Sequence, residues 1–343
     1  MSVQTDSDSL RPSLLDDPQL RRKPQTYWSM ALQALRRDRL TVSAIVVIIA
    51  MGLVSILAPV LSSTLVGVGP NDTNPDNAFA QPYFGPYIQW RLGMDTETAP
   101  LMLGESGGIP HWLGTDQLGR DQFVRLLYGG RVSLTIAFMA AFISLVIGVA
   151  VGLISGYFGG LIDDVVIWFI NTISSIPTIY ILIIITAIFK PNPITLTLFL
   201  GFLGWLGTAR FMRGNVFRVR EMDYTLAARA IGARNSRIMI QHILPNSVPV
   251  IIVITAISAG TLILVESALS FLGLGVQAPT ATWGSMLNRA QNLFFLRDPE
   301  TGGYVALHML IPAGVLITLT VLCLYLIGDG LRDALDPTLK NSG

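Results

Sequence analysis

Charged residues are scarce in this sequence. Only 13% of its 343 residues are Asp, Glu, Lys or Arg, whereas about 25% is usual for a soluble domain. Hydrophobic residues make up 51% and come in long runs, which argues against a soluble globular domain and indicates a helical integral membrane protein. The net charge of +1 gives no reason to expect nucleic acid as a partner.

Residues suited to catalysis or metal binding are also few. The single Cys323 excludes a disulfide framework and a cysteine metal cluster within the chain. His111, His242 and His308 are far apart in the sequence, and no nucleophile–base pattern accompanies them. No G-x-x-x-x-G-K-[ST] loop occurs, so the chain lacks this phosphate-binding loop of ATPases. We therefore expect neither an enzyme nor a cofactor or metal held by this chain.

Long apolar runs are the dominant positive feature. Each predicted span is long enough, as a helix, to cross a bilayer. The predicted fold class is therefore an all-α integral membrane protein with about six transmembrane helices. The predicted spans are about 40–61, 132–158, 165–189, 194–212, 248–272 and 306–327.

Two spans contain residues with predicted structural roles. Gly148, Gly152 and Gly156 recur every four residues, a small-x-x-x-small spacing that predicts close packing by another helix. Pro177 interrupts the third span and predicts a kink, because proline frees a backbone carbonyl. In a transporter such a kink lines or gates a path, and static packing is an equally good alternative.

The distribution of basic residues predicts the topology. Seven Lys and Arg precede the first span, and seven Arg lie between Arg210 and Arg237. The positive-inside rule places both termini and the 213–247 loop in the cytoplasm. The predicted divisions are a cytoplasmic tail (1–39), a first transmembrane helix (40–61), an extracytoplasmic segment (62–130) and a membrane core (131–343).

The cytoplasmic loop contains a short helical pattern. Tyr224, Ala227, Ala228 and Ile231 fall at i, i+3, i+4 and i+7 and are predicted to share one helix face. Gly232 follows them, where a residue with positive φ can end a helix. The small side chains on this face favour close approach by a partner protein. An amphipathic helix lying at the membrane surface is the alternative.

The motifs of this loop resemble those of a known family. Ala227-Ala228-x-x-x-Gly232, with Leu244-Pro245 further on, resembles the "EAA" loop of bacterial ABC-importer permease subunits. Leu226 stands where the general motif has its Glu, so an ion pair made there elsewhere cannot be made here. Three further stretches resemble the "C"-type subunit of the dipeptide/oligopeptide (nickel) transport family. They are residues 111–134, 266–273 and 328–337.

The resemblance implies a fold of the type I importer kind and a coupling helix that docks into a cleft on a cytoplasmic ATPase. The implied coupling residues are Tyr224, Ala227, Ala228, Ile231, Gly232, Leu244 and Pro245. We predict on this basis that Ala228→Asp, by charging the docking face, abolishes uptake while the protein still inserts.

The resemblance also implies the partner proteins and the cellular location of the protein. It implies a second, related permease in a heterodimer, two ABC ATPase subunits that hydrolyse ATP, and an extracytoplasmic substrate-binding protein. The expected place is the bacterial cytoplasmic membrane, and the implied substrates are di- and oligopeptides. A nickel chelate or glutathione is the alternative substrate. An ion-coupled secondary transporter is a further alternative, which would require paired intramembrane charges.

Glu266 is the other candidate for the translocation path. An ionisable group within a span is costly and is by default a functional candidate, here for a peptide ammonium. The alternative, which we favour, is a structural carboxylate capped by nearby hydroxyls or by an Arg of the neighbouring subunit.

Polar and aromatic residues outside the spans also carry predictions. His111, Asp116 and Asp121 fit no standard metal-ligand spacing, so we predict a structured turn leading into a helix. Trp283 and the Phe294-Phe295 pair are predicted to lie at the membrane interface.

Overall fold

The computed structural model describes residues 27–75, 78, 111–293, 295 and 307–335. Within those residues the only strand-like pairing is an isolated bridge between Thr115 and Asp121. The helices are α2 (Tyr27–Arg37), α3 (Arg39–Ile56), α4 (Ala58–Leu61), η1 (Ser62–Val66), α7 (Gln122–Phe158), α8 (Gly160–Ser174), α9 (Thr178–Phe189), α10 (Pro193–Arg220), α11 (Asp223–Ala230), α12 (Asn235–Arg237), η3 (Ile238–Ile243), α13 (Leu244–Phe271), α14 (Trp283–Gln291) and α15 (Leu307–Leu335), where η1 and η3 are π-helical.

Five helical segments in the described part of the chain are long and apolar enough to cross a membrane. A sixth results if α8 and α9, which are bent by 70° at their junction, form one broken span. The all-helical class and the five to six spans confirm the prediction from sequence. The five segments are Arg39–Ile56, Gln122–Phe158, Pro193–Arg220, Asn235–Phe271 and Leu307–Leu335.

Short polar side chains begin several of these helices. The carboxylate of Asp121 accepts a hydrogen bond from Val124 N at 2.9 Å, which fixes the start of α7. Asn192 does the same for α10 through Thr195 N at 2.9 Å, with Pro193 in the first helical position. The predicted turn before α7 is therefore confirmed.

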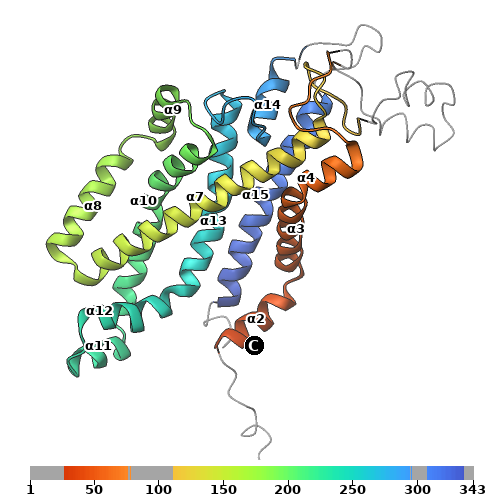
Figure 1. The fold of residues 1–343 in the computed structure, drawn as a ribbon. Coiled ribbons are helices and arrows are strands. Elements are labelled where there is room, and N and C mark those ends of the chain that lie inside the picture. Colours follow the sequence, from red (N-terminus) through yellow and green to blue (C-terminus); the bar gives the residue numbers. More distant parts are fainter. Residues whose placement is uncertain (1–26, 76–77, 79–110, 294, 296–306, 336–343) are drawn as a thin grey trace, which may run out of the picture.

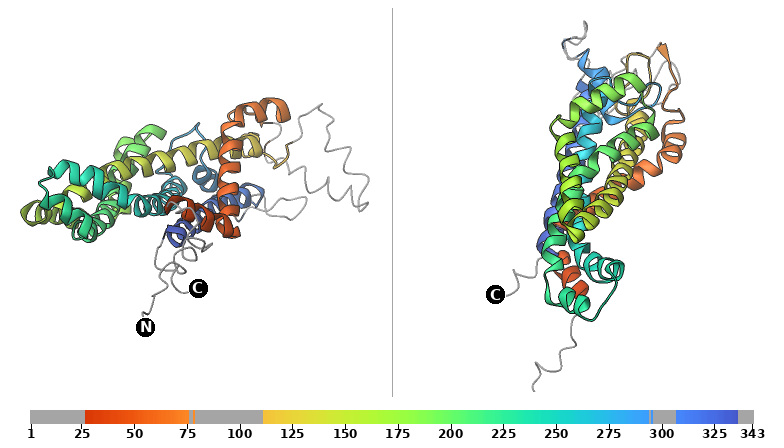
Figure 2. Two further views of the ribbon diagram at one scale, coloured as in Figure 1. Left: turned by 90° about the horizontal axis from the view of Figure 1, so that it is seen from below. Right: turned by 90° about the vertical axis from the view of Figure 1, so that its left-hand side faces the viewer.

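The long helices form one bundle, and the short ones lie at its two ends (Figure 1). α7 packs against α10 and α13, and α15 packs against α13 and α3. α14 lies at one end of the bundle, in contact with α13 and α15. α11 and α12 project from the opposite end, where α2 also lies, as Figure 1 and the right-hand view of Figure 2 show. We call these the α14 end and the α11 end.

Close approach between α7 and α10 depends on the three glycines of α7. A Cβ at Gly148 would lie 2.5 Å from Cβ of Thr208, and one at Gly152 would lie 2.6 Å from the carbonyl oxygen of Ala209. At Gly156 it would lie 2.8 Å from Cβ of Val216. Since real Cβ contacts are longer, no larger residue fits without movement. The predicted role in helix packing is confirmed.

The break between α8 and α9 lies at Pro177. Residues 175–177 separate the two helices, and Pro177 is the residue before the first turn of α9. Its ring has no N–H to continue α8, which explains the position of the break. The structure places Pro177 on the surface of this chain rather than in its core.

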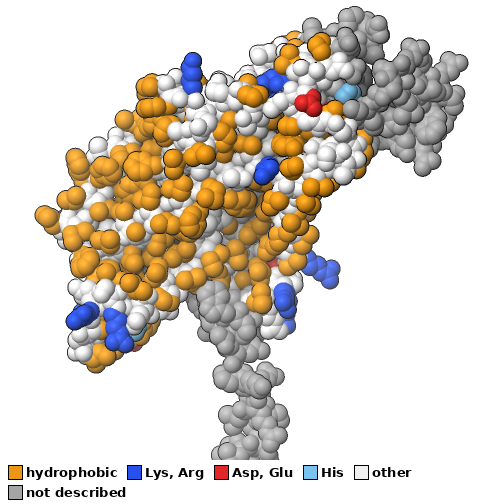
Figure 3. Space-filling model, viewed as in Figure 1, with side chains coloured by type: hydrophobic (Ala, Val, Ile, Leu, Met, Phe, Trp, Pro, Cys, Tyr) orange, Lys and Arg blue, Asp and Glu red, His pale blue; other side chains and the backbone are white. Residues whose placement is uncertain are grey.

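Hydrophobic side chains cover most of the face formed by α7, α8, α9 and α10 (Figure 3). The exposed hydrophobic side chains of these helices include Trp168 of α8, Tyr180 and Ile184 of α9, and Phe202 of α10, which are 59–66% exposed. An apolar surface of this size requires cover from lipid or from another protein. Basic side chains appear mainly toward the two ends of the bundle in the same view, at the α11 end and toward the α14 end.

Several predicted boundaries differ from the structure. α10 continues to Arg220 rather than ending near residue 212, and α15 continues to Leu335 rather than ending near residue 327. α7 begins at Gln122, ten residues before the predicted second span, because the turn at Asp121 starts the helix early. Leu244 and Pro245 lie inside the continuous helical segment Asn235–Phe271 rather than in a loop. The π-helical η3 precedes Pro245, so the helix continues although Pro245 has no N–H to donate.

Candidate functional site

Helix α11 stands at the tip of the α11 end and is closed by a defined turn. Gly232 has φ of +81°, a conformation that favours glycine. Gly232 N donates to Arg229 O at 3.0 Å, and Ala233 N donates to Ala228 O at 3.1 Å. These two bonds form a Schellman motif, so the predicted helix end at Gly232 is present as a rigid turn.

The inward side of α11 packs on its own chain. Ala228 is only 6% exposed and contacts an apolar cluster that includes Met212, Val216 and Ile238. Thr225 is fully buried, and its hydroxyl donates to Val219 O at 2.9 Å. α11 is therefore fixed to the end of α10 by packing and by one buried hydrogen bond.

The four residues expected to share a docking face are divided between two environments. Tyr224 is 38% exposed and Ile231 is 84% exposed, and Ala227 is also exposed, whereas Ala228 faces the core. The small side chain of Ala228 therefore allows α11 to pack closely against its own chain. Leu226, 41% exposed, lies on the outward side and extends the exposed apolar surface.

Further contacts hold the base of α11. Tyr157 Oη donates to Asn235 Oδ1 at 2.9 Å, and the guanidinium of Arg229 lies 5.6 Å from the centre of the Tyr157 ring. Asn215 Nδ2 donates to Ser247 Oγ at 2.7 Å, which joins α10 to α13. These bonds connect α11 and its neighbours to three long helices, α7, α10 and α13.

An ion pair links the bent pair of helices to the same end. Asp163 at the start of α8 accepts hydrogen bonds from Arg213 of α10 and from Ser155 of α7. Arg220 Nη1 donates to Gly156 O at 2.8 Å, and Phe217 stacks between the guanidinium groups of Arg213 and Arg220 at 4.5 and 4.6 Å. The sequence analysis missed this link, because Asp163 and Arg213 are 50 positions apart.

The last two predicted coupling residues, Leu244 and Pro245, lie close to α11 at the start of α13. Leu244 is half-buried and packs against the apolar cluster beneath α11. Pro245 is exposed at the start of α13. The partial burial of Tyr224 raises the pKa of its hydroxyl, an effect that nearby Arg218 opposes. Tyr224 is therefore neutral at physiological pH.

Glu266 of α13 is enclosed by hydroxyl groups. Its side chain is fully buried, with Ser133 Oγ donating to Oε2 at 3.0 Å and Ser270 Oγ donating to Oε1 at 2.8 Å. Trp283 N donates in turn to Ser133 Oγ at 3.2 Å. This arrangement favours the structural role for Glu266, because its side chain is fully buried in this chain and both of its oxygens already accept hydrogen bonds.

Trp283 is part of the core and not of a membrane interface. Its side chain is 1% exposed, and Nε1 donates to Leu126 O at 3.0 Å. The interface prediction for Trp283 is wrong, because Gly129 and Gly130 of α7 leave room for the indole ring. Phe295 is 88% exposed, and Phe294 lies outside the described residues.

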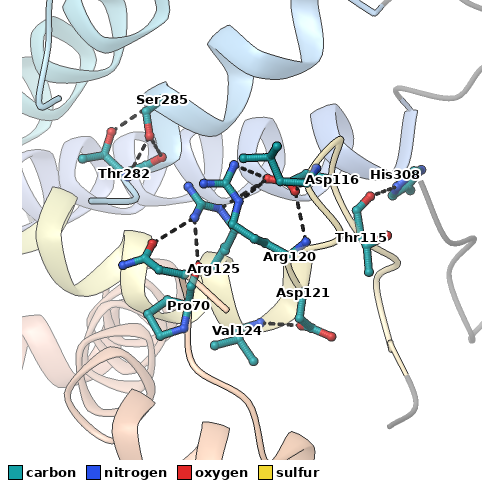
Figure 4. Close-up of polar contacts among 12 residues, drawn as sticks. Pro70, Thr115, Asp116, Arg120, Asp121, Val124, Arg125, Thr282, Ser285 and His308 are labelled. Atoms are coloured by element: carbon teal, nitrogen blue, oxygen red, sulfur yellow. Dashed lines mark hydrogen bonds and ion pairs between the residues drawn. The ribbon is translucent and has the colours of Figure 1, made fainter. Parts of the chain in front are cut away.

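The α14 end holds a buried ionic cluster (Figure 4). Asp116 accepts bonds from the guanidinium of Arg120 and from the backbone N–H groups of Leu118 and Arg120. Burial raises the pKa of Asp116, but these hydrogen bonds outweigh it and hold the pKa below its usual value. Asp116 is therefore an ionised, structural carboxylate.

Neighbouring residues extend this cluster. Arg125 of α7 donates through Nη1 to Pro70 O at 2.9 Å and lies 3.9 Å from Asp116. His111 Nδ1 lies 2.8 Å from Asp121 Oδ2, and His308 Nε2 lies 3.0 Å from Thr115 O. Among the residues that the structure describes, no group of His, Cys, Asp or Glu is arranged to hold a metal ion.

Two family models match the sequence. The model described as "Binding-protein-dependent transport system inner membrane component" matches residues 148–341, which include α11 and all of its supports except the outer part of α7. The model described as "N-terminal TM domain of oligopeptide transport permease C" matches residues 26–88.

Individual relatives cover most of the chain. The oligopeptide transport system permease protein OppC of Escherichia coli is 36% identical over 91% of this chain and 92% of its own length. The dipeptide transport system permease protein DppC of Bacillus subtilis is 36% identical over 76% of this chain and 77% of its own. The glutathione transport system permease protein GsiD of Pectobacterium atrosepticum is 37% identical over 70% and 76%.

Proposed function

The chain belongs to the family of binding-protein-dependent transport system inner membrane components, and from this premise we propose that it carries di- and oligopeptides through an ATP-driven importer. The relatives are transport permeases rather than enzymes, in agreement with the expectation that this chain is not an enzyme. Its part in the importer is the membrane-spanning permease subunit. The two peptide-permease relatives support the choice of substrate.

The observation that carries the proposal is the rigid mounting of α11. An importer must convert a movement of its ATPases into a change between inward- and outward-facing states. Moving such an equilibrium from 1:99 to 99:1 requires about 5.5 kcal/mol of differential binding. A helix closed by Gly232, bonded through Thr225 and packed through Ala228 can transmit a displacement without itself deforming.

The exposed side of α11 is the proposed contact with the ATPase. Met222, Tyr224, Leu226 and Ile231 present apolar surface at the tip of the chain, with Arg229 beside them. This composition fits a cleft with an apolar floor. Leu226 then makes a hydrophobic contact at the position where the general family motif has its Glu.

The remaining proposals concern the assembly and its orientation. The α11 end faces the bacterial cytoplasm, in accordance with its many arginines, and the α14 end faces the extracytoplasmic binding protein. A second permease pairs with this chain, and two ATPase subunits hydrolyse ATP below them. Pro177, at the break between α8 and α9, remains a candidate for the translocation path.

Reconstitution tests the proposal. The tagged chain is purified in mild detergent with the subunits that accompany it, returned to vesicles, and assayed for uptake of a labelled dipeptide with ATP inside the vesicles. We expect a second permease and at least one ATPase in the purified complex, and uptake that needs ATP and the binding protein. A chain that purifies without any ATPase, or uptake driven by an ion gradient alone, would contradict the proposal.

A further inference from the structure

A groove lies on the surface between α7 and α10, toward the α14 end. Its volume is about 560 Å³, within the range of ligand-binding pockets. It opens outward from the place where Gly201 of α10 packs against Ile143 of α7. Neither the ATPase contact at α11 nor the hydroxyl cage around Glu266 includes any of its lining residues.

The wall supplied by α7 changes in polarity along its length. Arg131 and Tyr128 line the groove nearest the α14 end, and Val132, Met139 and Ile143 continue it along the same helix. From Arg131 to Ile143 the helix rises about 18 Å. This length is close to one leaflet of a hydrocarbon core about 30 Å thick. The groove therefore has one charged side chain, Arg131, at its end nearest α14, and mostly apolar side chains over a length similar to one leaflet.

The wall supplied by α10 is apolar except for one hydroxyl. Pro193, Ile194 and Leu198 line it together with Thr197. Ile194 is 73% exposed and Leu198 is 51% exposed, so the groove is open along its side. Both helices are candidate membrane spans, and the open side therefore faces the bilayer or a neighbouring subunit.

Arg131 has unused binding capacity. Its side chain is exposed and forms no hydrogen bond or ion pair with the residues that the structure describes. A guanidinium matches a phosphate with two parallel hydrogen bonds, and the Tyr128 hydroxyl one turn away can add a third. No acidic side chain lines the groove, so the ammonium of a peptide or of a zwitterionic lipid would have no partner there.

We propose that this groove binds an anionic phospholipid, with its phosphate on Arg131 and one acyl chain along Met139 and Ile143. An arginine pairs with a phosphate through charge-assisted hydrogen bonds, so the same chemistry that holds anionic headgroups in basic pockets on the cytoplasmic side is available to Arg131 at the α14 end. The length of the groove, its open side, its polarity gradient and its single unpaired cation all fit this occupant. The inference stands apart from the proposed transport function, because it requires only that α7 and α10 lie in a bilayer.

Native mass spectrometry of the full-length chain, with any subunits that purify with it, tests the lipid site. Phosphatidylglycerol and phosphatidylethanolamine are added at equal concentration in detergent. We expect preferential retention of phosphatidylglycerol and about tenfold weaker binding in Arg131→Gln, since one charge-assisted contact is worth about 1.4 kcal/mol or more. Arg210→Gln removes an exposed arginine at the other end of the bundle and serves as the matched control.

A second pair of variants tests the acyl-chain channel. Met139→Trp fills the groove and should lower phosphatidylglycerol retention to a similar degree. Val146→Trp, at an equally exposed position of α7 outside the groove, should not. Unchanged lipid binding in either Arg131→Gln or Met139→Trp, or equal retention of both lipids, would overturn the proposal.

Two other occupants give distinguishable results. If a neighbouring subunit covers the groove, Met139→Trp lowers the recovery of that subunit and leaves lipid retention unchanged. If the groove takes the transported peptide, Arg131→Gln weakens uptake of free-carboxylate dipeptides more than of amidated ones, again without a change in lipid. Either result would replace the lipid assignment.

Discussion

The two ends of α7 are held in place by different interactions, although one helix supplies both. Toward the α11 end, Gly148, Gly152 and Gly156 bring its backbone directly against α10, and the ion pair of Asp163 and Arg213, which Ser155 joins, is partly exposed. At the α14 end, Asp116, Arg120 and Arg125 form a buried ionic cluster. Close packing of small residues fixes the distance between two helices, whereas a buried ion pair also fixes the direction of its hydrogen bonds.

This difference matches the tasks proposed for the two ends. The α11 end must pass the movement of a partner to the spans, and a closely packed pair of helices can do so without changing its own geometry. The α14 end must keep the outer turns of α7 in place against Pro70 and against α14. The comparison predicts that single substitutions at the two ends differ in size and in kind.

The largest expected effect is the loss of the carboxylate at Asp116. Asp116→Asn leaves Arg120 and Arg125 buried without a negative partner, which costs about 3–5 kcal/mol of folding stability. Thermal unfolding of the purified protein in detergent measures this loss. A variant as stable as the wild type would show that the ionic cluster does not hold this end.

The same residue predicts a pH dependence. The folded-state pKa of Asp116 lies below 3.8, so its contribution is present above pH 3.8 and is lost as the pH falls through the folded value. Stability of the wild type should decline through this acidic range, and that of Asp116→Asn should decline less.

The next prediction compares a charged substitution on the buried side of α11 with one on its exposed side. Ala228→Asp places a carboxylate in an apolar cluster and should destabilise the α11 end by about 3 kcal/mol, so that uptake is lost together with local structure. This reason differs from the docking face expected from sequence. Leu226→Asp places the same charge on the exposed side and should abolish uptake while the unfolding temperature stays unchanged.

Protease resistance of the loop and uptake in vesicles distinguish these two variants. The ATPase should be lost from the purified complex of Leu226→Asp, because the charge faces the proposed cleft. Normal transport by Leu226→Asp would show that the outward side of α11 is not the docking surface.

The smallest expected effect tests the packing of α7 on α10. Gly152→Ala adds a methyl group 2.6 Å from Ala209 O and should cost about 1–3 kcal/mol. Gly207→Ala on α10 meets no atom within 4 Å and serves as the control, with no loss expected. Equal unfolding temperatures for the two variants would contradict the role of the glycines.

Local patterns in the sequence determined the class of fold, the spans, the turn before α7 and the end of α11. Each depends on neighbours close along the chain: an apolar run, an Asp121 that caps its own helix, a Gly232 that adopts positive φ. The glycine spacing in α7 also predicted close packing, because the need for space is a property of the glycines themselves. The motifs of residues 224–245 were sufficient to indicate the family.

Only the tertiary structure decided which side chains meet across the chain. Ala228 faces inward because Met212 and Val216 of α10 lie beneath it, and Trp283 is buried because Gly129 and Gly130 make room for it. Glu266 is capped by Ser133, which is 133 positions away. A periodic pattern gives the face of a helix but not its direction, since burial depends on which distant helix packs against it.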